Sequence, residues 1–150
     1  MKRILLLTVL GTAVAFAVGA SAAPGSATLV IRHQIRGCHA WSFNGGVYKA
    51  TQTLHLRRGG SLLVVNNDVM PHQLVKASGP AWVTKLNKRG GHMGVPMHGA
   101  GMMSHMGATV KATFPTKGVY RLTTKAGEDY MEMGSTVGED YVLRAIVIVA

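Results

Sequence analysis

The stretch SLLVVNNDVMPH, residues 61–72, decides the fold class because a strand, a turn and a candidate metal ligand follow one another in it. Residues 61–66 are mostly aliphatic and β-branched, which favours a strand. Asn67 and Asp68 then favour a turn, because their side chains bond to nearby backbone groups. Pro71 stiffens the chain before His72, so the imidazole is held rigidly beyond a strand end, as a metal ligand requires. The alternative is a half-buried histidine bonded to a backbone carbonyl.

Further strands are predicted on both sides of this stretch. Residues 47–56 alternate with a period of two, and a tight turn at Gly59 and Gly60 makes the strands on either side of it antiparallel. The predicted strands are 27–33, 47–56, 61–66, 72–76, 110–114, 119–124 and 141–149. They argue for an all-β fold, an antiparallel Greek-key β-sandwich. Residues 78–108 are expected to form one long loop rich in Met, His and Gly, with a helical turn over residues 82–88.

The composition fits one folded domain that binds no nucleic acid. Of 150 residues, 47% are hydrophobic and 15% are charged, which is enough apolar surface for one core. The single cysteine excludes an internal disulfide, a zinc site made of cysteines alone and an iron–sulfur cluster. The 16 Lys and Arg outnumber the 6 Asp and Glu, but they form no stripe or dense run. An acidic partner protein or an anionic envelope surface fits this charge better than nucleic acid.

Residues 1–23 are predicted to be a secretory signal peptide. A basic start and an apolar run over residues 4–19 precede Ala20-Ser21-Ala22, which supplies the small residues needed for cleavage. The apolar run is short for a membrane span. Residues 24–150 are therefore expected to be a periplasmic or secreted domain with no stable membrane span. The alternative is an uncleaved N-terminal anchor.

Cys38 and His39 form a second group of candidate ligands. The strands on either side of the turn at residues 59–60 are predicted to be antiparallel. The chain before the strand 47–56 should therefore lie at the same end of the sandwich as the chain after the strand 61–66. A thiolate and an imidazole would then converge with His72. Such ligands are typical of copper, with zinc as the runner-up. The alternative is that Cys38 is a small buried hydrophobic residue beside Trp41.

Residues 92–106 form a third candidate, with five Met and three His in fifteen residues and no period. The neighbouring residues are Gly, Pro and Ser, and a flexible loop gains little by exposing thioethers. Thioethers with imidazoles bind Cu(I), and imidazoles bind Cu(II). An adaptable hydrophobic loop is the alternative. The candidate ligands of this segment are His92, Met93, Met97, His98, Met102, Met103, His105 and Met106.

The motifs NDVMPH (residues 67–72) and GVYRLTT (residues 118–124) resemble the cupredoxins, the plastocyanin and azurin family of small copper proteins. The resemblance covers residues 27–149 and implies that His72 is a copper ligand. In that family the second motif runs into a Cys ligand, followed by a His and a Met. Thr124 stands in place of that Cys here. Without a bond between Cys and copper, this loop cannot form an ordinary blue copper centre.

Two outcomes follow from this departure. Either a non-blue copper site is rebuilt from His72, Cys38 and His39, completed by Glu128 or Met131, or the fold persists without copper. The rebuilt site is the interpretation we favour. Five of the six acidic residues lie between residues 128 and 140, which marks this segment as a ligand-bearing loop or as one side of charge pairing.

The sequence thus predicts an exported copper-binding protein that acts in copper handling or one-electron transfer. Its partners would be the metal ion and an acidic redox or copper-transfer protein. No arrangement of nucleophile, base or paired acids can be argued, so an enzyme is not expected. The rival interpretation is a metal-free β-sandwich that binds an envelope component or a partner protein.

Overall fold

The computed structural model describes residues 23–33, 39–88, 101–126 and 143–150. The strands of one sheet are β1 (Ser26–His33), β2 (His39–Phe43), β4 (Ser61–Asn67), β6 (Val83–Lys88) and β8 (Thr109–Thr113). Those of the other are β3 (Thr51–Leu56), β5 (His72–Ser78), β7 (Met102–Met103), β9 (Gly118–Ala126) and β10 (Arg144–Val149).

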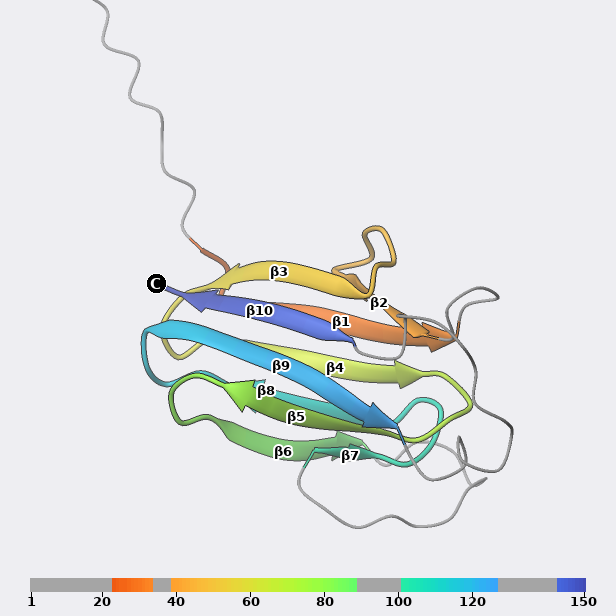
Figure 1. Ribbon diagram of the computed structural model, residues 1–150. Helices are drawn as coiled ribbons and strands as arrows, with labels where there is room; N and C mark the ends of the chain where they lie inside the picture. Colours follow the sequence, from red (N-terminus) through yellow and green to blue (C-terminus); the bar gives the residue numbers. More distant parts are fainter. Residues whose placement is uncertain (1–22, 34–38, 89–100, 127–142) are drawn as a thin grey trace, which may run out of the picture.

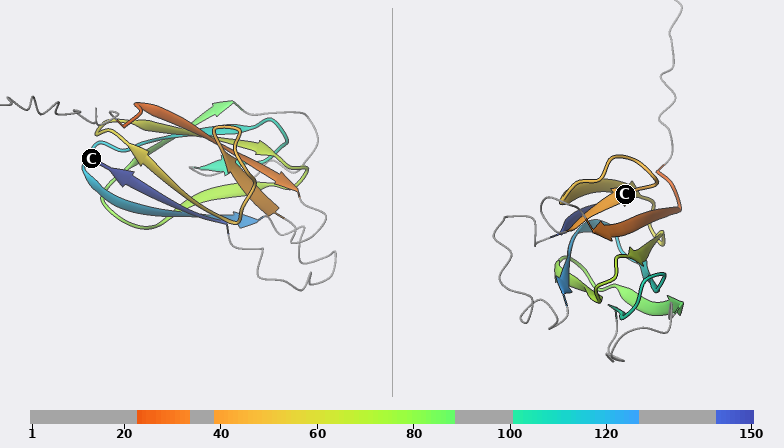
Figure 2. Two further views of the ribbon diagram at one scale, coloured as in Figure 1. Left: turned by 90° about the horizontal axis from the view of Figure 1, so that it is seen from above. Right: turned by 90° about the vertical axis from the view of Figure 1, so that its right-hand side faces the viewer.

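The strands form two five-stranded sheets stacked as a sandwich (Figures 1 and 2). The strand orders are β2-β1-β4-β8-β6 and β3-β10-β9-β5-β7. The described ranges contain no helix, and therefore none with the length and hydrophobicity to cross a membrane. The predicted all-β sandwich is confirmed. The predicted signal peptide, residues 1–23, lies outside the described residues except for its last residue.

Alternating side chains build the core between the sheets. In β4 every second residue is buried, and β10 follows the same pattern, because successive side chains of a strand point to opposite faces. Phe114 and Tyr120 pack edge to face with ring centroids 4.8 Å apart. Trp41 is fully buried in the same core, and its indole N–H donates to the carbonyls of Ala50 and Arg144. That side chain ties β2 of one sheet to the starts of β3 and β10 in the other.

The strand pairing differs from the prediction in two respects. β3 and β4 lie in different sheets, so the turn at residues 57–60 passes from one layer to the other and forms no hairpin. Six pairs are antiparallel as predicted, whereas β1 with β4 and β3 with β10 are parallel. A glycine turn fixes the reversal of the chain locally, but more distant strands decide which neighbour each strand takes.

The segment at residues 78–108 is not one long loop. Residues 83–88 form β6, which pairs with β8, so the predicted helical turn was wrong. Residues 102–103 form β7, which pairs with β5. β6 is an edge strand whose side chains are almost all exposed. It therefore lacks the alternation of apolar and polar residues by which a half-buried strand is recognised.

Candidate metal centre

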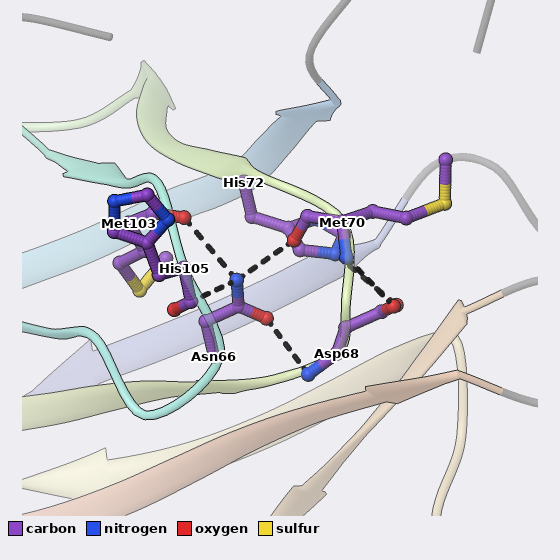
Figure 3. A network of polar contacts seen from close by, with 6 residues as sticks. All are labelled: Asn66, Asp68, Met70, His72, Met103 and His105. Atoms are coloured by element: carbon purple, nitrogen blue, oxygen red, sulfur yellow. Dashed lines mark hydrogen bonds and ion pairs between the residues drawn. The ribbon is translucent and has the colours of Figure 1, made fainter. Parts of the chain in front are cut away.

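His72 opens β5 at one end of the sandwich and is 1% exposed. Its Nε2 lies 3.3 Å from Oδ2 of Asp68, which is also buried (Figure 3). With the proton on Nε2, the ring donates to the carboxylate, and the lone pair stays on Nδ1, which is also buried. A carboxylate that orients an imidazole in this way is the usual support of a metal-binding histidine.

The turn before His72 is held by its own side chains. The Asp68 backbone N–H donates to Oδ1 of Asn66 at 2.9 Å, and the Met70 N–H donates to Oδ1 of Asp68 at 3.1 Å. Asp68 thus serves both the turn and the imidazole, one carboxylate oxygen for each. This confirms the turn predicted from the Asn-Asp pair and explains why His72 follows it in a fixed position.

Asn66 connects this turn to a distant part of the chain (Figure 3). Its fully buried amide donates to the carbonyls of Met70 at 2.8 Å, Met103 at 3.2 Å and His105 at 3.4 Å. The Gly107 N–H also donates to the Asn66 carbonyl, at 2.6 Å. The turn before His72 and residues 103–107 are therefore held together. Sequence reasoning assigned Asn66 only to the end of a strand, because nothing local reveals these partners.

Strands β1 and β2 bring a further predicted ligand position to this end. The parallel register pairs Arg32 of β1 with Asn67 of β4, and the antiparallel register pairs His33 with His39. The start of β2 therefore lies at the same end of the sheet as the end of β4, with β1 between them. This is the end expected from the sequence, but the β1–β4 pairing puts it there rather than a hairpin. Cys38 and the side chain of His39 lie outside what the structure describes.

Strands β7 and β9 flank His72 on its two sides. His72 pairs with Met103 of β7 and with Ala126, the last residue of β9. The described chain thus stops directly beside His72, just before the segment that carries Glu128 and Met131, and it resumes at Leu143. Glu128 and Met131 themselves lie outside the described residues.

Four of the eight candidate ligands in the Met- and His-rich segment can be placed. Met103 is a fully buried core residue, Met102 and His105 are half-buried, and Met106 is 47% exposed. Met102 and Met103 lie in a strand, which corrects their assignment to an irregular loop. The other four candidates lie outside the described residues: His92, Met93, Met97 and His98.

Among the residues that the structure describes, no three His, Cys, Asp or Glu side chains come together as a ready metal site. His72 and Asp68 form a pair in which the carboxylate orients the imidazole. At this end the described part therefore contains one candidate ligand, His72, that is supported by a carboxylate.

The described strands make this chain an all-β, two-sheet sandwich. No known family matches the sequence, and no curated protein matches it either.

One similar structure is a multicopper oxidase from Pediococcus acidilactici, with a TM-score of 0.41 and 14% identity over 99% of this chain and 30% of that chain. Another is an amicyanin mutant in its Cu(I) form, with a TM-score of 0.38 and 15% identity over 82% of each chain. A further multicopper oxidase has a TM-score of 0.41 and 12% identity over 88% of this chain and 46% of that one. The chain thus spans under half of either oxidase.

Proposed function

We propose that this protein binds copper at the end of the sandwich where His72 lies, and that it acts in copper handling or one-electron transfer. The observation that carries the proposal is the buried imidazole of His72, oriented by the buried carboxylate of Asp68 at 3.3 Å. A metal-binding histidine donates its other ring N–H to such a carboxylate, which fixes the tautomer and makes the ligand more basic.

The arrangement of strand ends supports the rest of the proposed ligand set. β1 ends beside the end of β4, β2 begins on the far side of β1 at the same end, and β9 ends beside His72. Cys38 immediately precedes β2, and Glu128 and Met131 follow β9 within a few residues. We propose that Cys38 and His39 join His72, with Glu128 or Met131 completing the site. Copper, when bound, supplies a Cu(I)/Cu(II) couple and an affinity for thiolate, thioether and imidazole.

The protein's own contribution is to hold one nitrogen in place and to keep water away from it. The hydrogen bond to Asp68 fixes the ring of His72, and the Asn66 amide fixes the turn that carries it. Fully buried Met103 covers the neighbouring position on β7. A ligand held in this way needs little rearrangement when the charge of the metal changes.

The described part of the Met- and His-rich segment supports copper handling over electron transfer alone. Met102 and His105 are half-buried and Met106 is exposed, so they are accessible to an incoming ion. The same segment is bonded to the turn before His72 through Asn66. We propose that it collects Cu(I) near the His72 site, outside the cytoplasm, and that an acidic protein is the partner.

Titration of the purified protein with Cu(I) and Cu(II) tests the proposal. His72→Ala should weaken copper binding by about 100-fold or more, because a first ligand is lost and its supports alone change affinity 10- to 100-fold. Cys38→Ser should abolish the thiolate charge-transfer absorption of the Cu(II) form. The matched control is His55→Ala, since His55 is exposed on β3 and remote in sequence from the proposed ligands.

Each outcome separates the rival interpretations. Copper binding that is unchanged in His72→Ala would overturn the proposed site. A wild-type protein that binds neither Cu(I) nor Cu(II) would favour the metal-free sandwich. Tight binding of zinc that copper does not displace would favour a zinc site made from the same Cys and His residues.

A further inference from the structure

A half-open hollow of about 320 Å³ lies on the outer face of the sheet formed by β3, β10, β9 and β5. This is the front sheet in Figure 1, and its outer face points away from the core. The lining includes Thr51, Ala77, Thr123 and Ile146 and is mostly apolar. None of the residues of the His72 site lines it, so this hollow has no part in the proposed copper function.

The sequence explains why the sheet is hollowed here. Thr51 on β3 and Thr123 on β9 are small residues that pair with Arg144 from its two sides, and Ala77 on β5 is also small. The pairing of β5 with β9 also shifts its register between Lys76 and Ser78, so Ala77 is the extra residue of a bulge. A bulge bends its strand and often occurs beside a binding site.

Two arginines lie at this hollow on neighbouring strands. Arg144 of β10 is opposite Thr123 of β9, and Ile146 is opposite Arg121. Arg121 and Arg144 are therefore diagonal neighbours on one face, with backbone positions about 7 Å apart. Both are exposed, and both line the hollow. Two like charges at this spacing repel each other unless an anion lies between them.

The rest of the described chain offers no such anion. Asp68 is the sole carboxylate side chain within the described ranges, and it is buried against His72. A bound negative group would therefore meet two cations with no competing acidic side chain from these parts of the sheet. Guanidinium groups suit a carboxylate because their N–H donors match its two oxygens.

We propose that this hollow binds a small organic carboxylate with an apolar body. The carboxylate lies between Arg121 and Arg144, and the apolar body covers Ile146 and Ala77. A few precisely placed polar groups at the rim of a mostly apolar hollow of this size are the usual features of a small-molecule site. Charge complementarity selects the anion, and the apolar lining selects its body.

Calorimetric titration of the purified protein with octanoate tests this proposal. Arg121→Gln and Arg144→Gln should each weaken octanoate binding by about 10-fold, the effect of losing a hydrogen bond to a charged group. The matched control is Arg58→Gln, which removes an exposed arginine that does not line the hollow. Octan-1-ol, which has the same body without the charge, should bind at least 10-fold more weakly than octanoate.

Amide NMR shifts of the wild-type protein provide a second readout that needs no variant. Octanoate should shift the signals of Thr51, Thr123 and Ile146 and leave those of β4 unchanged. No octanoate binding at millimolar concentration would overturn the proposal. Equal losses in Arg58→Gln and Arg121→Gln, or equal binding of octan-1-ol, would also overturn it. These results leave the copper proposal unaffected, because they involve none of its residues.

Discussion

At the scale of single residues, Asn66 is the side chain on which the shape of the His72 turn depends most. Its amide donates to three carbonyls, and its oxygen accepts from the Asp68 N–H. Asn66→Ala leaves these buried groups without that partner, at a cost of 1–3 kcal/mol for a buried group in general. We expect a loss of about 3 kcal/mol in the free energy of unfolding, measured in urea.

The neighbouring Asn67 provides the control for this variant because it is exposed. Asn67→Ala should change the free energy of unfolding by less than about 0.5 kcal/mol, as surface substitutions usually do. Equal losses in the two variants would mean that the hydrogen bonds of Asn66 contribute little to stability.

Replacing Asp68 should lower the affinity for copper more than it lowers the stability of the fold. Asp68→Asn keeps an oxygen that can accept from the Met70 N–H, but it replaces the carboxylate that orients His72. We expect copper affinity to fall about 10- to 100-fold, as it does when other supports of a metal ligand are removed. Competition with a chelator of known affinity measures this change. An unchanged affinity would show that Asp68 does not support the ligand.

The sequence allowed His72 to be selected but not Asn66, for a physical reason. The Asn-Asp pair and Pro71 act within a few residues of His72, so their effect can be predicted from the sequence. The Asn66 amide instead bonds Met103, which is 37 residues away. Only the folded chain brings these two residues together. The ligand roles of Cys38, Glu128 and Met131 stay predictions.

At the scale of elements, Gly101 determines whether β7 can lie beside β5. Its φ of 84° is in the left-handed region, and a Cβ there would be 2.5 Å from the Leu74 carbonyl oxygen. Its own carbonyl accepts from the Leu74 N–H. Gly101→Ala should therefore cost more than the conformational penalty of about 1 kcal/mol alone, and should detach β7 from β5.

Gly107 separates the conformational penalty from the clash with Leu74. It has a similar φ of 80°, but nothing lies within 4 Å of an added Cβ. Gly107→Ala should show the conformational penalty alone, and thermal unfolding of both variants measures the difference. Similar losses in the two variants would mean that the contact with Leu74 relaxes at little cost.

The elements also show where sequence patterns are sufficient. β4 and β10 alternate buried residues with residues that are mostly half-buried, and both strands were predicted within a few residues of their observed ends. β6 was missed because it lies at an edge with little burial. The turn between β3 and β4 reverses the chain as predicted, but it crosses from one sheet to the other, so the two strands do not pair. The alternation of apolar and polar residues indicates which side of a strand is buried. It does not identify the neighbouring strand with which that strand pairs.

At the scale of the whole molecule, Trp41 joins the two sheets. Its ring is fully buried, and its indole N–H lies 3.1 Å from the Ala50 carbonyl and 3.2 Å from that of Arg144. Trp41→Phe removes both hydrogen bonds and leaves a small void. We expect a loss of about 2–3 kcal/mol in the free energy of unfolding.

Trp82 is the matched control, because it is only partly buried and its ring centroid lies 6.3 Å from that of Phe114. Trp82→Phe should cost about 1 kcal/mol or less. Urea unfolding followed by near- and far-ultraviolet circular dichroism checks both values. If Trp41→Phe costs no more than Trp82→Phe, the link between the sheets lies elsewhere in the core.

Several strand ends that border the predicted ligands meet at one end of the whole molecule. That convergence comes from the β1–β4 and β5–β9 registers, which no local pattern encodes. The most direct test of copper binding at His72 is anomalous diffraction at the copper edge from crystals grown with copper. We expect a peak within bonding distance of Nδ1 of His72. A peak on other residues alone, with none near Nδ1 of His72, would contradict the proposed site.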